Sequence, residues 1–273
     1  MNFPFKLVSR AYKKDNTIIN INGTNIGDNN LPIIAGPCTI ESKAQLLSTA
    51  KNCKDYGASF LRGGAYKART SPYSFQGLGK EALEYLYEVK KETGLPVVSE
   101  LIDIDDLPYF DFVDIIQIGA KNMQNFSLLK KLGKCNKPIL LKRGFSNTIE
   151  ELLLSAEYIM ESGNTNIILC ERGIRTFEPY TRNTFDINAI PLLKKLSHLP
   201  VIADPSHGTG LSELVLPISL AAVSAGADGL IIEIHDLPSC ALCDGRQAIT
   251  SLEFKDLSQA VKAISPFAYK QKF

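Results

Sequence analysis

The densest group of reactive side chains lies at residues 229–244, GLIIEIHDLPSCALCD. An apolar run there ends at Glu233. The loop that follows carries five more side chains able to bind a metal or transfer a proton: His235, Asp236, Cys240, Cys243 and Asp244. A surface loop with incidental polar residues would have the same composition. Whether this loop belongs to a functional site therefore depends on which side chains follow the other apolar runs of the chain.

Composition describes an ordinary globular protein. The chain has 273 residues, of which 45% are hydrophobic and 22% charged, enough to bury the core of one large domain or two small ones. The formal net charge of +1 provides no overall field for a nucleic acid or an anionic membrane, so we expect neither as a partner.

Cysteine usage and the termini indicate a compartment. Six cysteines are scattered through a chain too long to need covalent cross-links, which predicts free thiols in a reducing environment. The first 14 residues lack the apolar core of a signal peptide. The longest apolar run, near residues 214–225, contains Pro217 and is too short to span a bilayer. We expect a cytoplasmic protein.

From residue 31 onward, short apolar runs alternate with segments of helical period. The eight runs, rich in Ile, Val and Leu, are residues 32–37, 59–64, 96–100, 114–120, 138–144, 166–173, 200–204 and 229–235. The helical segments are residues 43–56, 79–93, 104–110, 125–132, 148–162, 187–197, 212–225 and 247–264. Runs without alternation are typical of strands buried on both faces. Eight such units predict an α/β fold, a TIM (β/α)8 barrel, with a doubly wound open sheet as the alternative.

Residues 1–30 differ from this pattern and predict an N-terminal β-hairpin extension, with strands in residues 5–12 and 17–26. Residues 31–273 would form the barrel. No linker or low-complexity segment marks a boundary. We therefore expect one catalytic domain, residues 1–273, with no separate regulatory domain.

In a barrel, the carboxyl ends of the strands converge on one mouth, where the active site lies. The first, seventh and eighth strands, neighbours after closure, lead to Cys38, His207, Glu233 and Asp244. One thiolate, one imidazole and two carboxylates suit a divalent transition metal such as zinc, manganese or iron. Strands two, four, five and six lead to cations that we expect across the mouth from the metal side: Arg62, Lys67, Lys121, Lys142 and Arg172. These suit a small substrate with phosphate and carboxylate groups.

A series of motifs along the chain resembles that of 3-deoxy-7-phosphoheptulonate (DAHP) synthases. It includes GPCTIES, LRGGAYKARTSPYSFQGLG, QIGAKNMQNF, LLKRG, CERGIRTFE, DPSHGTG and ALCDGRQ, and runs from about residue 5 to residue 263. The resemblance is to the type I subgroup close to 3-deoxy-8-phosphooctulonate synthase. It implies a metal-dependent condensation of phosphoenolpyruvate with erythrose 4-phosphate, the first step of the shikimate pathway. It also implies a homo-oligomer, a tetramer or a dimer.

The resemblance also implies residue roles. The divalent metal would be bound by Cys38, His207, Glu233 and Asp244. Phosphoenolpyruvate would be surrounded by Arg62, Lys67, Glu100, Ala120, Lys121, Lys142 and Arg172. The aldose phosphate would meet Arg69, Thr70 and Asp244. Catalytic roles fall to Lys67, His207 and Asp244, with Lys67 and His207 as proton carriers.

Three positions depart from the family pattern. Ala68 stands where Pro is usual, Lys121 where Arg is usual, and Arg246 where Pro is common. Lysine at 121 keeps the charge but loses the planar fork of arginine. Cys240 and Cys243 could also be a C-x-x-C redox or zinc pair, although the chain has no second such pair.

Three alternative functions remain open at this stage. The octulonate synthase would take arabinose 5-phosphate, but Arg69 directly after Ala68, followed by Thr70, matches the heptulosonate pattern. A Schiff-base aldolase could use Lys142 as its nucleophile and would need no metal. A catalytically inactive binding protein could share the scaffold. We expect His198, which precedes the seventh strand, to be structural, and no role is assigned to His235.

Overall fold

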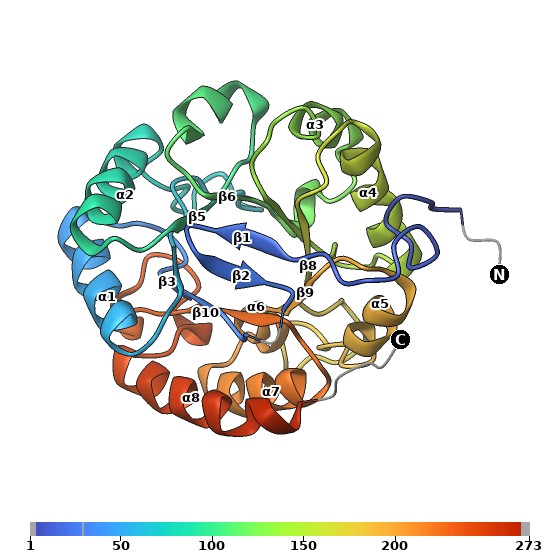
Figure 1. Ribbon diagram of the computed structural model, residues 1–273. Coiled ribbons are helices and arrows are strands. Elements are labelled where there is room, and N and C mark those ends of the chain that lie inside the picture. The colour runs from blue at the N-terminus through green and yellow to red at the C-terminus, as the bar shows by residue number, and fades with distance from the viewer. Residues whose placement is uncertain (1–3, 29, 269–273) are drawn as a thin grey trace.

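Eight parallel strands close into a barrel surrounded by helices in the computed structural model, which describes residues 4–28 and 30–268 (Figure 1). The barrel strands are β3 (Ile33–Gly36), β4 (Phe60–Arg62), β5 (Val97–Glu100), β6 (Ile115–Ile118), β7 (Ile139–Lys142), β8 (Ile167–Glu171), β9 (Val201–Ala203) and β10 (Gly229–Glu233). The last strand, β10, pairs in parallel with both β9 and the first barrel strand, β3. The predicted TIM barrel is confirmed, and closure rules out the open sheet.

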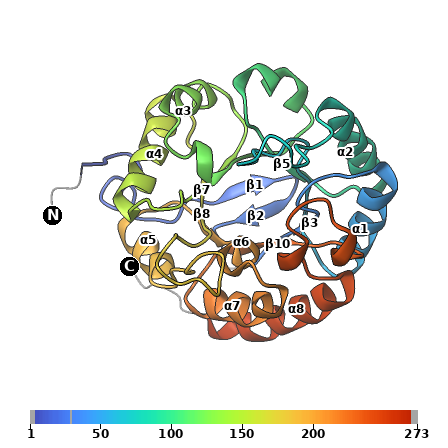
Figure 2. The same ribbon diagram turned by 180° about the vertical axis from the view of Figure 1, so that it is seen from behind.

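The α-helices form the outer ring, except the short α6, which lies inside it (Figures 1 and 2). They are α1 (Lys43–Asp55), α2 (Lys80–Thr93), α3 (Phe126–Leu132), α4 (Ile149–Glu161), α5 (Ala189–Leu196), α6 (Pro205–Thr209), α7 (Ser212–Ser224) and α8 (Ser251–Ile264). Capping boxes begin α4 and α8, where Thr148 and Thr250 exchange hydrogen bonds with Glu151 and Glu253.

The helices of the structure differ from the prediction in two places. Residues 104–110 form a 3₁₀-helix, η1 (Ile104–Phe110), in place of an α-helix. Pro108 inside it lacks the N–H that an α-helical hydrogen bond would use. The short helix α6, which begins with Pro205 directly after β9, was not predicted. Five residues are too few to show a helical period.

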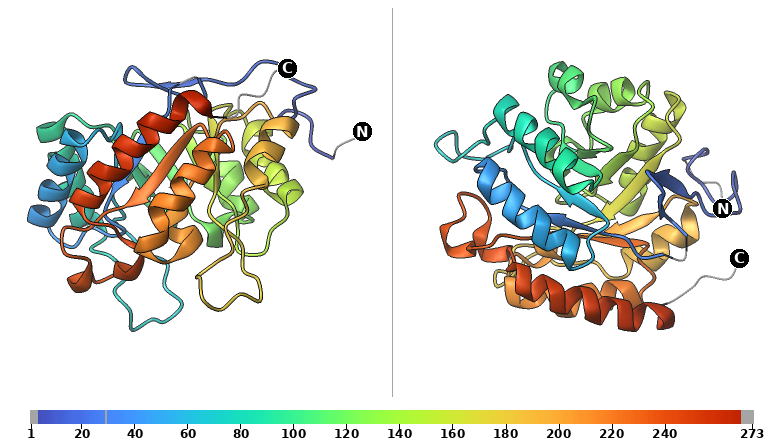
Figure 3. Two further views of the ribbon diagram at one scale, coloured as in Figure 1. Left: turned by 90° about the horizontal axis from the view of Figure 1, so that it is seen from below. Right: turned by 60° about the vertical axis from the view of Figure 1, so that its left-hand side comes forward.

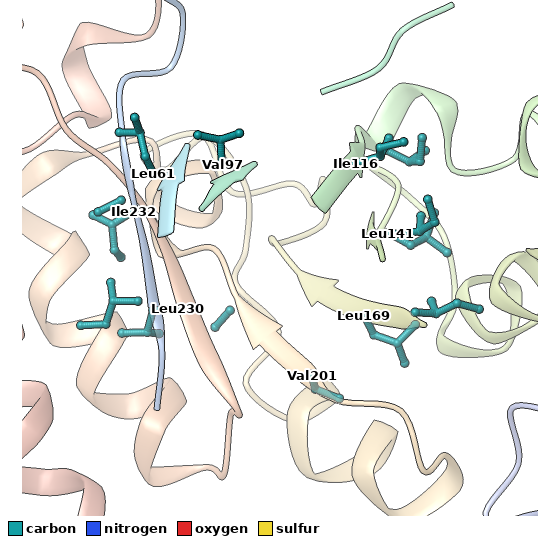
Figure 4. Packing of buried hydrophobic residues seen from close by; sticks show 14 of the residues in the cluster. Leu61, Val97, Ile116, Leu141, Leu169, Val201, Leu230 and Ile232 are labelled. Carbon is teal, nitrogen blue, oxygen red and sulfur yellow. The ribbon is translucent and has the colours of Figure 1, made fainter. Parts of the chain in front are cut away.

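The barrel core has two layers because successive strand residues point to opposite faces. Outward-pointing side chains, such as Leu61, Val97 and Leu141, pack against the helices (Figure 4). Inward-pointing side chains form a separate cluster that fills the barrel, and those of the strands are Ile34, Phe60, Val98, Ile115, Leu140, Ile168, Cys170, Ile202 and Ile231. The inner layer determines which side chains at the strand ends point into the mouth.

The N-terminal hairpin exists, but its strands are not where we predicted them. Both lie within the second predicted segment, as β1 (Ile19–Ile21) and β2 (Thr24–Ile26), joined by Asn22 and Gly23. These two residues have φ angles of 49° and 88°, the left-handed conformations of a tight hairpin turn that Asn-Gly favours. Residues 5–12 are mostly turns.

The hairpin closes the end of the barrel opposite the mouth. Ile19, Ile21 and Ile26 are buried in the same cluster as the inner barrel side chains. Residues before the hairpin are also held to the barrel, since the Glu157 carboxylate of α4 accepts the backbone N–H groups of Lys6, Leu7 and Val8 at 2.8–3.0 Å. The hairpin therefore lies at one end, and the long loops after β4 and β8 project from the other (Figure 3).

None of the helices in residues 4–28 and 30–268 has the length and apolar character needed to cross a bilayer.

Candidate active site

Four potential metal ligands meet at the carboxyl ends of β3, β9 and β10. Donor atoms of Cys38, His207, Glu233 and Asp244 all lie within 4.8 Å of one another. Glu233 is the last residue of β10 and follows the inward-pointing Ile231 by two positions, so its side chain also points into the barrel. Closure of the barrel brings β3, β9 and β10 together, as we predicted from the order of the strands.

The orientation of His207 suits a metal ligand. Its Nδ1 lies 2.8 Å from the buried Asp204 carboxylate and donates to it, which leaves the Nε2 lone pair directed into the cluster. Burial lowers the pKa of His207 to about 4, although Asp204 and Glu233 act to raise it. The imidazole is therefore neutral near pH 7, the form that binds metals.

The surroundings of Glu233 also suit a bound cation. Its Oε1 lies 3.3 Å from His207 Nε2, so two lone-pair acceptors face each other. Oε1 is buried and accepts no hydrogen bond, because the 2.9 Å contact with Arg62 is an ion pair without hydrogen-bond geometry. Burial alone would raise the pKa of Glu233, but the electrostatic interactions with His207, Arg62 and Lys67, in that order of size, lower it to about 2. A buried anionic oxygen with a free lone pair beside an imidazole lone pair suits a divalent metal.

Two cations expected across the mouth lie instead against the donor cluster. The Lys67 ammonium is 2.8 Å from Cys38 Sγ and 3.0 Å from Asp244 Oδ2, and Arg62 pairs with Glu233. The prediction that the cations lie across the mouth from the metal ligands is therefore wrong for Lys67 and Arg62. β4 is paired directly with β3, and buried charges are stable only when paired with opposite charge.

Asp244 and Cys243 lie where the cluster meets the pocket beside it. Asp244 has a φ of 54° and also contacts Arg182 at 3.3 Å. The positive charges of Lys67 and Arg182 hold the pKa of Asp244 well below its usual range despite burial. Cys243 is buried, 3.7 Å from Cys38 Sγ, and accepts a hydrogen bond from Arg69.

A cavity of about 370 Å³ opens beside the cluster at the mouth. His207, a predicted metal ligand, lines it together with most of the predicted substrate residues: Lys67, Arg69, Thr70, Glu100, Ala120, Lys121, Lys142, Arg172 and Asp244. Arg62 is not among the lining residues and lies buried in its ion pair with Glu233. The concentration of cations suits a small anionic ligand.

Strand parity explains which strand-end charges reach the mouth. Glu100 and Lys142 follow the inward-pointing Val98 and Leu140 by two residues, so they also point inward. Glu171 follows the inward-pointing Cys170 by one residue, and its carboxylate pairs with Arg143 at 2.9 Å away from the cavity lining. We had predicted the strand ends but had not used this alternation to separate inward-pointing from outward-pointing charges.

Lys142 occupies a fixed position in the cavity wall. Its Nζ lies 2.5 Å from Asp204 Oδ2, and both side chains are buried. Burial opposes ionisation of Asp204, but the charge of Lys142 and the hydrogen bonds from His207 keep its pKa well below the usual range. Asp204 thus joins a cavity-lining cation to a metal-ligand candidate.

Sequence reasoning missed several residues of the cavity wall. Phe145, Arg175, Arg182 and Asn183 line it, and the last three lie in the long loop after β8. Two further arginines in the loop that begins with Arg172 were a signal that we did not use.

The remaining histidines and cysteines have clear surroundings. His198 binds Thr17 and the Leu7 carbonyl at the closed end, which confirms its structural role. His235 is buried near Glu41, 3.5 Å away, and accepts a hydrogen bond from the N–H of Leu237. All six cysteines fall within the described residues and are free thiols, as predicted. Cys240 is exposed whereas Cys243 faces Cys38, an arrangement that gives no support to a C-x-x-C pair.

Comparisons with known proteins agree with this geometry. The model of the DAHP synthetase I family matches residues 13–267. A curated phospho-2-dehydro-3-deoxyheptonate aldolase from Thermotoga maritima is 55% identical over 263 residues, which cover 96% of this chain and 78% of the relative. A crystal structure of the DAHP synthase of that organism matches with a TM-score of 0.94 and 54% identity, covering 97% of this chain and 78% of the other. A 2-dehydro-3-deoxyphosphooctonate aldolase from Geobacter sulfurreducens is more distant, at 34% identity over 87% of this chain and 93% of the relative.

Proposed function

The chain belongs to the DAHP synthetase I family and catalyses that family's condensation of phosphoenolpyruvate with erythrose 4-phosphate, and we propose that this reaction uses a divalent metal. The observation that carries the proposal is that Glu233 Oε1, which accepts no hydrogen bond, faces His207 Nε2 at 3.3 Å. Cys38, His207, Glu233 and Asp244 would hold the metal. When bound, a divalent metal supplies Lewis acidity that polarises the aldehyde.

The cavity residues would bind and orient the two substrates. Arg172 and Lys142 present buried cations to the phosphate and carboxylate of phosphoenolpyruvate, and Glu100, Ala120 and Lys121 line the same cavity. Arg69 and Thr70 extend the wall toward Asp244, where the aldose phosphate would bind. Fixed cations of this kind stabilise charge that develops during the condensation.

Lys67 is the better candidate for the proton carrier. His207 donates Nδ1–H to Asp204 and directs its Nε2 lone pair toward the metal donors, so it has no proton to offer the cavity. The Lys67 ammonium lies between Cys38 and Asp244 and also lines the cavity. It can therefore give a proton to a substrate atom at the boundary between the donor cluster and the pocket.

The structure disfavours the Schiff-base alternative. Lys142, its candidate nucleophile, forms a 2.5 Å ion pair with the buried Asp204. An ammonium in such a pair has no lone pair with which to attack a carbonyl.

Phosphate release from phosphoenolpyruvate tests the proposal. We expect activity to disappear after chelation and to return with manganese, and Cys38→Ala to lose both bound metal and activity. Cys240→Ala, which removes an exposed thiol from the same loop as Asp244, should keep both. Full activity in protein shown by elemental analysis to be metal-free would refute the metal requirement.

The same assay tests the choice of aldose. With manganese present, erythrose 4-phosphate should be strongly preferred over arabinose 5-phosphate. Equal or faster turnover with the five-carbon sugar would overturn the assignment and favour the octonate relatives. We also expect a homo-oligomer, to be measured by light scattering.

A further inference from the structure

The arginines that line the cavity fall into two pairs. Arg69 donates to Cys243, and Arg182 contacts Asp244 and Gln247. Arg172 and Arg175, by contrast, have no carboxylate within ion-pair distance among residues 4–28 and 30–268. In that part of the chain, the Arg172 guanidinium donates a hydrogen bond only to the carbonyl of Gly173, at 3.3 Å.

One aromatic ring lies against both of these guanidinium groups. The ring centroid of Phe145 is 5.0 Å from Arg172 Cζ and 4.6 Å from Arg175 Cζ. The Phe145 carbonyl also accepts the backbone N–H of Arg175 at 2.6 Å. Phe145 follows β7 and the two arginines follow β8, and these strands are paired, so the contact is a product of barrel closure.

The ring orients the guanidinium groups without neutralising them. A cation–π contact leaves the N–H donors of arginine available to an anion. Two like charges against one ring repel each other, and a phosphate dianion that accepts hydrogen bonds from both would relieve that repulsion. Lys142 at the end of β7 lines the same cavity, with its ammonium paired to Asp204.

We propose that Arg175 is a further substrate-binding residue, held by Phe145 beside Arg172 to bind the phosphate group of phosphoenolpyruvate. This inference rests on the proposed function. Phosphoenolpyruvate is favoured over the aldose phosphate because Arg175 is grouped with Arg172 and Lys142. Arg69, the residue proposed for the aldose phosphate, instead donates to Cys243 in the loop after β10. Phe145 is a positioning residue, since it acts through the two arginines.

The test compares Michaelis constants for the two substrates. In the metal-loaded enzyme, Arg175→Ala should raise KM for phosphoenolpyruvate about tenfold, the effect of losing one charge-assisted hydrogen bond. The KM for erythrose 4-phosphate should change less than about twofold. Phe145→Leu keeps an apolar side chain but removes the ring, and it should raise KM for phosphoenolpyruvate by about threefold to tenfold. Arg175→Lys should fall between the original and the alanine variant, because it keeps the charge but not the fork.

Arg246→Ala is the matched control. Arg246 is exposed in the loop after β10, lies outside the cavity lining, and carries the same charge. If Arg175→Ala has no more effect than Arg246→Ala, or raises KM for the aldose instead, the inference is wrong.

A direct measurement of phosphoenolpyruvate affinity, without aldose, separates this inference from the proposed function. Normal turnover combined with unchanged phosphoenolpyruvate affinity in Arg175→Ala would overturn the inference alone. Absence of phosphate release in the unaltered chain with both sugars would overturn the proposed function, whatever Arg175→Ala does to phosphoenolpyruvate affinity.

Discussion

Asp204 joins the two halves of the site, and its replacement by asparagine should show this as a loss of stability. The carboxylate is fully buried and accepts from Lys142 Nζ at 2.5 Å, His207 Nδ1 at 2.8 Å and His207 N at 3.0 Å. Asparagine keeps the shape and one acceptor oxygen but leaves the Lys142 ammonium buried without an opposite charge. Removing one partner of a buried ion pair costs about 3–5 kcal/mol.

The assay is equilibrium unfolding in urea, followed by circular dichroism on metal-free protein. Thermal unfolding gives a second measurement. At about 2–4 °C per kcal/mol, the same loss of free energy of unfolding should lower the melting temperature by roughly 6–20 °C. A second variant isolates the cause. Adding Lys142→Met to Asp204→Asn removes the unpaired ammonium and should recover most of the lost free energy of unfolding, although phosphoenolpyruvate binding would suffer.

Metal affinity gives an independent measurement of the same change. The Asp204 carboxylate orients His207, and loss of such a partner typically weakens metal binding by about 10- to 100-fold. Competition with a chelator would measure this in Asp204→Asn. Stability within about 1 kcal/mol of the original, no recovery with Lys142→Met and unchanged metal affinity would together refute the reasoning.

Two predictions concern the closed end of the barrel. Glu157→Ala removes the acceptor of three backbone N–H groups and should lower the free energy of unfolding by about 1–3 kcal/mol, discounted for partial exposure. Glu161→Ala on the exposed end of α4 serves as its control in urea unfolding, and equal effects would contradict the role of Glu157. Burial lowers the pKa of His198 below its ordinary value of 6.5, so below that pH the unfolded chain binds a proton that the folded chain resists. Stability should therefore decrease as pH falls through 6.5. His198→Gln should make the urea midpoint of unfolding, measured from pH 5 to 8, depend less on pH. An unchanged pH dependence in this variant would contradict the role of His198.

The local sequence was sufficient to predict the barrel and to place the four potential metal ligands at its mouth. Eight runs of Ile, Val and Leu separated by helical segments have few alternative arrangements. Residues at the ends of parallel strands must share one end of the barrel, so Cys38 and Asp244 could be placed together across 206 positions of sequence. The hairpin could have been placed as well, since Asn22-Gly23 was a readable turn signal that we did not use.

Only the tertiary structure decided which of the strand-end charges contact one another. Lys67 was expected across the mouth from Cys38, yet it lies 2.8 Å from the thiol, and Arg62 is buried against Glu233. Phe145 and Arg175 are 30 residues apart and carry no shared motif, but pairing of β7 with β8 places the guanidinium 4.6 Å from the ring. Spacing along the chain determines which face of a strand a side chain occupies. Distances between strands depend on barrel closure, loop conformation and the pairing of buried charges, which are properties of the folded chain as a whole.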